Sequence, residues 1–294
     1  MREEARREGV WQFLTYTFVL VMTFLTIVPL YWIVVASTLP EQAFLSAGSA
    51  PRLIPGGYFA ENFAALQQRL SVGFLFFDEL LNTDFGFVGG VFNSVFIAVA
   101  YTLLSLVVCS RAGFAFAKYE FRYKEPIFYS ILATLILPIQ LLVIPLFLLM
   151  SQLGLTNSYW AIILPWLANP LGIFLMRQNM KSIPDALLES ARMDGATEFQ
   201  LYYRIALPTM KSSLAALAIV LFLFQWILFL FPLVILETDK YTIPVAIDQL
   251  VGAQRVYYDQ IMVAATLSIV PIFFLFLFLQ KQFVSGILAG SVKE

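Results

Sequence analysis

The chain has 294 residues, of which 60% are hydrophobic and only 13% are charged, with 18 basic residues against 19 acidic ones. A soluble domain carries roughly a quarter charged residues, so this much apolar surface argues against a soluble fold. The balanced charge argues against a nucleic-acid-binding surface. The chain has no histidine and a single cysteine, Cys109. An internal disulfide is therefore excluded, and a metal site or histidine-based catalysis is disfavoured.

Long uncharged stretches predict membrane-spanning helices. Residues 9–40, 85–110, 126–176, 212–236 and 260–280 carry no charged side chain. A spanning helix needs about 20 apolar residues, so 126–176 fits two helices joined by the polar turn Ser151–Asn157. A span must also satisfy its own backbone hydrogen bonds, which favours helices. We expect an all-α membrane protein with a single transmembrane domain over 1–294. Its six transmembrane helices should lie at about 11–36, 88–110, 126–149, 158–176, 212–236 and 260–280, the first retained rather than cleaved.

The basic residues predict the orientation. If the N-terminus is cytoplasmic, 14 of the 18 Lys and Arg lie in inside segments, and the outside loops hold only Arg52, Arg69, Lys240 and Arg255. This agrees with the positive-inside rule, which the reverse topology would violate. Both termini are therefore expected in the cytoplasm. By the same rule, Lys118, Arg122 and Lys124 are interpreted as topology determinants.

Two loops are longer than a simple connection requires. In the extracytoplasmic loop 38–87, apolar residues recur with helical spacing over Asn62–Leu81, which predicts a helix at the outer surface. On one side of that helix lie Phe63, Leu66, Leu70, Phe74 and Phe77.

The cytoplasmic loop 177–211 is the most charged segment, with five basic and four acidic residues. It predicts a helix, a break and a second helix. Pro184 suits a first turn, Gly195 a stop at positive φ, Thr197 a cap, and Pro208 the end of the second helix. Elsewhere, prolines inside the spans are expected to kink or break helices: Pro138, Pro145, Pro165, Pro170, Pro232 and Pro271.

The same loop resembles the coupling loop of permease subunits of bacterial ATP-binding-cassette importers. That family's pattern is Glu-Ala-Ala, then three residues ending in Asp-Gly, then Ala, with Leu-Pro about a dozen residues later. Matching positions here are Glu189, Ala191, Asp194, Gly195, Ala196, Leu207 and Pro208. Two positions depart from it. Ser190 replaces the middle Ala, and Ser212 stands where a second Pro often follows.

Further stretches resemble the carbohydrate branch of this family, and the tail is similar to that of the maltose-type second permease. They are Pro29–Trp32, Ala36–Thr38, Asn93-Ser94, Leu137–Gln140, Ile144–Leu146, Trp226, Phe231–Leu233 and the tail 280–293. The resemblance implies alternating access in a bacterial or archaeal cytoplasmic membrane. It also implies a second homologous permease, two ATP-binding subunits and an extracytoplasmic solute-binding protein as partners. The chain has no phosphate-binding loop of its own, so no cofactor is expected on it, and ATP and magnesium belong to the partner ATPase.

The candidate sites fall into two groups. On the resemblance, the residues expected to transmit motion to the ATPase are Glu189, Ser190, Ala191, Asp194, Gly195 and Ala196. Glu189 alone would read as an ordinary solvated helix charge. Uncharged polar or aromatic residues of the spans are candidates for the substrate pathway: Asn93, Gln140, Asn169, Gln225 and Trp226. Interhelical hydrogen bonding is an equally common reason for such residues. The family's usual Asn after the fifth-span Trp is replaced by Ile227, which weakens a sugar contact there.

Three other functions fit the sequence less well. The same machinery could carry glycerol phosphate or a polyol, because Val35–Leu39 and Leu53–Gly56 have some likeness to a glycerol-phosphate permease. However, no basic residue lies inside a span to neutralise a phosphate. An ion-coupled secondary transporter is disfavoured because the spans hold no Asp or Glu. A membrane enzyme would need clustered catalytic groups that the spans lack.

Overall fold

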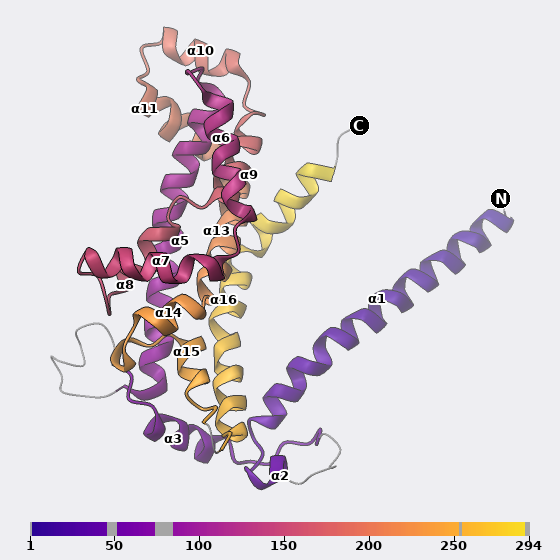
Figure 1. Cartoon of the computed structure of the whole chain (residues 1–294). Coiled ribbons are helices and arrows are strands. Elements are labelled where there is room, and N and C mark those ends of the chain that lie inside the picture. The colour runs from indigo at the N-terminus through magenta and orange to yellow at the C-terminus, as the bar shows by residue number, and fades with distance from the viewer. Residues whose placement is uncertain (1, 46–51, 74–84, 253–254, 292–294) are drawn as a thin grey trace. The chain divides into compact units, whose positions relative to one another are not determined.

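The computed structural model describes residues 2–45, 52–73, 85–252 and 255–291 (Figure 1). This part of the chain contains helices and one isolated bridge, Val251–Val256, but no strand, which confirms the all-α prediction. The chain divides into two compact units, Met1–Arg69 with Ile247–Ser268 and Leu70–Ala246 with Ile269–Glu294.

The first unit contains α1 (Arg2–Ala36), α2 (Gln42–Leu45), α3 (Phe59–Arg69) and the part of α16 (Tyr258–Ser291) up to Ser268. Its best-packed point is the end of α1. There the amide group of Asn62, from α3, donates to the carbonyls of Ser37 (3.0 Å) and Leu39 (2.9 Å). At the other end of α3, Arg69 donates to Gln260 (2.8 Å) and lies 3.6 Å from the ring centroid of Tyr257.

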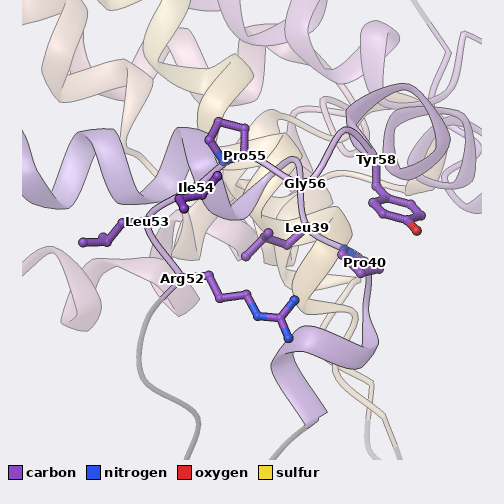
Figure 2. A pocket seen from close by; sticks show the side chains of 8 residues that line it. All are labelled: Leu39, Pro40, Arg52, Leu53, Ile54, Pro55, Gly56 and Tyr58. Carbon is purple, nitrogen blue, oxygen red and sulfur yellow. The ribbon is translucent and has the colours of Figure 1, made fainter.

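A shallow pocket of about 460 Å³ lies in the same unit (Figure 2). It forms because the chain after Arg52 folds back on the end of α1. The Tyr58 amide donates to the Thr38 carbonyl and the Gly56 amide to the Thr38 hydroxyl, both over 2.9 Å. The lining is mainly apolar, and Arg52 is its one charged residue. Lining residues are Leu39, Pro40, Arg52, Leu53, Ile54, Pro55, Gly56 and Tyr58.

The second unit is organised around α5 (Gly86–Lys118). Helices α9 (Pro170–Met180) and α13 (Lys211–Trp226) pack along it. The close approach of α9 requires Gly113, because a Cβ atom there would lie 2.5 Å from the Cβ of Met176. Shorter elements also belong to the unit: α6 (Lys124–Ala133), η1 (Thr134–Ile136), α7 (Ile139–Gln152), α8 (Tyr159–Ile163), η2 (Leu164–Trp166), α14 (Leu230–Ile235), η4 (Thr238–Lys240) and the part of α15 (Ile243–Asp248) up to Ala246.

Three helical stretches are long and apolar enough to cross a membrane: Trp11–Ala36, Gly86–Lys118 and Tyr258–Gln280. Three bent helix pairs pass the same test, so the described residues provide up to six spans if each pair is one span. The pairs are Lys124–Ile136 with Ile139–Gln152 (104°), Tyr159–Trp166 with Pro170–Met180 (44°), and Glu198–Thr209 with Lys211–Trp226 (82°).

One local expectation is confirmed and one is not. The stretch 126–149 breaks at Pro138 as expected, because the proline ring disfavours helical geometry in the preceding residue, and Leu137 is extended with ψ 120°. The outer-loop helix predicted over Asn62–Leu81 ends at Arg69. Gly73 instead donates its amide to the Asp239 carbonyl (2.8 Å), so the chain leaves the helix to pair elsewhere. Phe74 and Phe77 lie outside the described residues.

Candidate functional site: the coupling segment

The predicted helix, break and helix are all present in the loop 177–211. Helix α10 spans Asp185–Met193, with Pro184 at the N-cap position immediately before it. Gly195 follows at φ +81°. The Gly195 amide donates to the Arg192 carbonyl and the Ala196 amide to the Ala191 carbonyl, each over 3.0 Å. This pair of bonds is the Schellman motif, which satisfies the last carbonyls of a helix and requires a left-handed residue at the Gly195 position.

The second helix begins with a capping box. The hydroxyl of Thr197 accepts the Gln200 amide, and the side chain of Gln200 accepts the Thr197 amide (2.8 Å). Thr197 was predicted as the cap, and Gln200 completes it. Helix α11 (Glu198–Gln200) continues through the π-helix η3 (Leu201–Ala206) into α12 (Leu207–Thr209). Pro208 was expected to end this helix, but the break falls two residues later, at Met210.

The start of α10 is fixed to the end of α5 by Lys118. Its side chain is 4% exposed, and its ammonium group lies 2.7 Å from the Asp185 carboxylate and donates also to the Ile183 carbonyl. The hydrogen bond and the charge of Lys118 lower the pKa of Asp185. The buried side chain of Leu188, 1% exposed, packs the same helix onto the unit. Lys118 is therefore an anchor of α10.

The end of α10 is fixed by Glu198. Its carboxylate accepts two bonds from the Arg192 guanidinium, at 2.9 and 3.2 Å, and one from the Tyr119 hydroxyl. The hydrogen bonds from Arg192 and Tyr119 lower the pKa of Glu198. Partial burial and the neighbouring carboxylate raise the pKa of Tyr119 to about 12. The start of α10 is thus bonded to Lys118 directly and its end to Tyr119 through Glu198, and Lys118 and Tyr119 are adjacent residues at the end of α5.

Contacts of Arg177 and Tyr202 also hold this end of α5 in place. Arg177, 5% exposed, donates to the Phe116 carbonyl (3.2 Å), pairs with Glu125 and lies 3.9 Å from the Phe128 ring centroid. Tyr202 of η3 shares a 2.7 Å hydrogen bond with Ser110 of α5. Sequence reasoning missed these roles. The contacts join residues 52 to 92 positions apart, and no local pattern marks such pairs.

The outward surface of the segment is exposed and acidic. Glu189, Ser190 and Asp194 are exposed, whereas Ala191 and Ala196 are half-buried. Neither Glu189 nor Asp194 has an ion-pair partner among the residues that the structure describes. Met193 is 89% exposed and adds an apolar group. An exposed apolar group beside unpaired charges on a firmly anchored helix suits docking to a partner protein. Figure 1 shows α10 and α11 together at one end of the α5, α9 and α13 bundle.

The candidate pathway residues have separate local environments. Asn93 is fully buried. It donates to the carbonyls of Gly73 (3.0 Å) and Tyr241 (3.3 Å) and accepts the Tyr159 hydroxyl (2.7 Å). Asn169 caps α9 by accepting the Gly172 amide (3.0 Å). The side-chain amides of Asn93 and Asn169 are therefore engaged in structural hydrogen bonds and do not need a substrate as a partner.

The other three pathway candidates differ from these two. Gln140 is exposed on α7. Gln225 and Trp226 are each 5% exposed at the end of α13, and the Trp226 ring stacks on Phe222. The side-chain amide oxygen of Gln225 is buried with no hydrogen-bond partner in the described part of the chain. A buried acceptor without a donor is costly, so Gln225 is the member of the set with spare capacity for a hydroxyl group.

Comparison with known proteins agrees with the helical membrane fold. The family described as "Binding-protein-dependent transport system inner membrane component" matches residues 110–288, from inside α5 through the coupling segment to the tail. The chain belongs to this family, and it is a transport permease of the ATP-binding-cassette importer type.

Similar individual proteins cover nearly the whole chain. The arabinooligosaccharides transport system permease protein AraQ of Halalkalibacterium halodurans is 34% identical over 92% of this chain and 93% of its own. The lactose transport system permease protein LacG of Rhizobium radiobacter is 33% identical over 95% of each chain. The sn-glycerol-3-phosphate transport system permease protein UgpE of Escherichia coli is 30% identical over 88% of this chain and 89% of its own.

A solved structure shares the fold. A crystal structure of a bacterial ABC transporter that imports the acidic polysaccharide alginate has a chain with a TM-score of 0.73. The match covers 95% of this chain and 98% of that one, at 20% sequence identity.

Proposed function

We propose that this chain is one permease subunit of an ATP-driven importer for a sugar or oligosaccharide and forms half of its translocation pathway. The carrying observation is α10, an exposed acidic helix anchored at both ends to α5, in a chain 34% and 33% identical to AraQ and LacG. The domain is a single six-span permease over 1–294, with the spans near 11–36, 88–110, 126–149, 158–176, 212–236 and 260–280. Each of the first two bent helix pairs is then one span, and the fifth span begins at α13, after the bend that follows Glu198–Thr209.

In this proposal both termini and the loop 177–211 face the cytoplasm, and the loop 38–87 faces outward, in a multi-pass protein of the cytoplasmic membrane. The distribution of Lys and Arg supports this orientation. The partners are a second homologous permease, two ATP-binding subunits, an extracytoplasmic solute-binding protein and the membrane lipid. ATP and magnesium bind the partner ATPase. This chain contributes no catalytic group, and its coupling residues Glu189, Ser190, Ala191, Asp194, Gly195 and Ala196 transmit motion.

Rigid anchoring supports the transmitting role. A helix moves the spans only if it moves with them as one body. Lys118, Tyr119 and Tyr202 join the coupling segment to α5, along which α9 and α13 pack. A displacement of α10 is therefore transmitted to three helices of the pathway, α5, α9 and α13. Gln225 and Trp226 are the residues of this pathway that we favour for substrate contact, with Gln140 next, whereas Asn93 and Asn169 are engaged in structural bonds.

A neutral sugar is favoured over glycerol phosphate. The proposed spans contain no basic residue that would neutralise a phosphate, and the similarity to UgpE is lower than that to AraQ and LacG. Hydroxyl groups need only uncharged donors and acceptors, which Gln225 supplies.

Reversal of one charge tests the coupling role. Glu189→Lys should reduce ATP-driven uptake of an arabino-oligosaccharide by the reconstituted importer at least tenfold and weaken co-purification of the ATPase. Glu189 is exposed and has no ion-pair partner in the described chain, so the fold should survive. Glu120→Lys is the matched control, since Glu120 is an exposed acid outside the segment with a weak surface pair to Lys124. Equal uptake by the two variants would refute the coupling assignment.

A further inference from the structure

A basic groove lies at the C-terminal end of the loop 177–211 and is not used in the function proposed above. We define it by its five lining residues, Tyr203, Arg204, Leu207, Pro208 and Lys211, and its volume is about 420 Å³. These residues come from η3, α12 and the first position of α13. The groove therefore lies where the cytoplasmic segment turns into the fifth proposed span.

Local structure determines which side chains reach the groove. Pro208 has no amide hydrogen to donate to the carbonyl four residues earlier, and the preceding turn is widened into the π-helix Leu201–Ala206. Tyr202 is buried and bonded to Ser110. Because Tyr202 is held inward, the next two residues, Tyr203 and Arg204, are exposed.

The groove is positively charged, and no carboxylate of the described residues forms an ion pair with its basic side chains. Arg204 and Lys211 are exposed, and neither has an ion-pair partner within residues 2–45, 52–73, 85–252 and 255–291. By contrast, Lys118, Arg177 and Arg192 in the same unit are each paired with a carboxylate. Two unpaired cations on either side of Leu207 and Pro208 favour an anionic ligand that also has an apolar part.

Exposed aromatic rings extend this surface. Phe199 and Tyr203 stack with parallel rings 6.1 Å apart, and they are 62% and 61% exposed. Large exposed rings next to basic side chains are typical of the boundary between membrane and water.

The bend of the chain places this surface against the membrane. The segment Glu198–Thr209 meets α13 at 82°. If α13 crosses the bilayer with an ordinary tilt, the segment runs almost parallel to the membrane surface. Arg204 and Lys211 then lie at the level of the lipid headgroups, where clustered basic residues attract anionic lipid.

We propose that the basic groove binds the headgroup phosphate of an anionic phospholipid in the cytoplasmic leaflet. The phosphate contacts Arg204 and Lys211, and an acyl chain lies against Leu207 and Pro208. This surface is basic. The docking surface at α10 is acidic, because its unpaired groups are the carboxylates of Glu189 and Asp194. The inference adds a lipid site to the proposed function and rests on α13 being a membrane span whose first residues lie on the cytoplasmic side.

Lipid retention by the purified importer tests the proposal. The complex is prepared with an equal mixture of phosphatidylglycerol and phosphatidylcholine, and its bound lipid is counted by native mass spectrometry. We expect wild type to retain phosphatidylglycerol selectively, and Arg204→Gln with Lys211→Gln to lower its occupancy at least fivefold. Arg122→Gln with Lys181→Gln is the matched control, because it removes two exposed basic charges outside the groove. The control should retain the lipid as wild type does.

Several results would overturn the proposal. Equal phosphatidylglycerol in the groove variant and the control would do so, as would equal retention of phosphatidylcholine by wild type. Displacement of the lipid by millimolar inorganic phosphate would indicate a site for the free anion. Loss of the ATPase subunits with unchanged lipid would indicate a protein-docking surface. If the double variant is not monodisperse, the single variants Arg204→Gln and Lys211→Gln take its place, each with a partial loss expected.

Discussion

At the scale of single residues, the coupling segment depends on one backbone conformation. Gly195 has φ +81°, and a Cβ atom added there would meet nothing within 4 Å. The space is open, so the demand for glycine comes from the backbone alone. A residue with a side chain pays about 1–2 kcal/mol in the left-handed region, and this cost would fall on the Schellman motif that ends α10.

We predict that Gly195→Ala lowers ATP-driven uptake several-fold because the end of α10 shifts or frays. Gly154→Ala is a close control. Gly154 also has positive φ, +69°, and open space around it, but it lies in the turn between α7 and α8. Both variants should lower the thermal midpoint of the purified chain to a similar extent. Only Gly195→Ala should lower uptake in proteoliposomes, and equal uptake loss in both would contradict the role given to Gly195.

Residues with local signals were predictable from the sequence. Gly195 and Thr197 follow rules of helix ends that act over four or five positions, and the structure places them accordingly. Lys118 was interpreted from sequence only as a topology determinant, since its partner Asp185 is 67 positions away. The roles of Asn93 and Asn169 were equally hidden, because a buried amide looks the same in sequence whether it meets a backbone carbonyl or a substrate.

At the scale of elements, α10 is a short helix with little stability of its own. A helix of nine residues is marginal in water, so tertiary anchors keep it formed. Lys118 contributes the anchor at its start. The pKa of Asp185 is lowered by this contact, so the contact stabilises the native state above the usual aspartate pKa of about 3.9. The contribution disappears as pH falls through the lowered pKa.

We predict that Lys118→Met loosens α10 while the spans stay folded, because Met fills the buried site without donating to Ile183 or Asp185. Amide hydrogen exchange over 185–193 should become roughly tenfold faster at pH 7. Lys124→Met removes an ion pair to a 91% exposed carboxylate and should leave this exchange unchanged. Wild type should approach the Lys118→Met rate only below about pH 4, after correction for intrinsic exchange. If loosening began near neutral pH, another group would be the anchor.

The helices themselves were only partly predictable. Uncharged stretches located the apolar segments, because charge is costly in lipid. The same stretches do not show the direction in which each helix runs. The 104° turn between Lys124–Ile136 and Ile139–Gln152 depends on Pro138 and on how α7 packs against α14. Likewise, residues 70–73 are not helical in spite of their helical spacing, and Gly73 donates its amide to the Asp239 carbonyl instead.

At the scale of the whole molecule, the proposed topology distributes the few charged residues unevenly between the two sides of the membrane. The basic residues collect on the cytoplasmic side. There, Lys118, Arg177 and Arg192 form ion pairs that anchor the coupling segment and the end of α5. Arg204 and Lys211 line the basic groove and are available to bind lipid. The outer side has few cations, and two of them, Arg69 and Arg255, are engaged with Gln260 and Glu41. One charge asymmetry thus serves both topology and mechanism.

The topology gives the last prediction. Cys109 is fully buried, so the chain should not react with a membrane-impermeant maleimide and offers a clean background. Lys181→Cys and Thr156→Cys each place a thiol at an exposed position, the first in the loop 177–211 and the second in the turn between α7 and α8. We expect Thr156→Cys to be labelled in intact spheroplasts and Lys181→Cys only after permeabilisation. Labelling of both positions from the same side would mean that the bent pair between them does not cross the membrane as one span. The reverse pattern would mean that the orientation given by the basic residues is wrong, and α10 would then face away from any cytoplasmic ATPase.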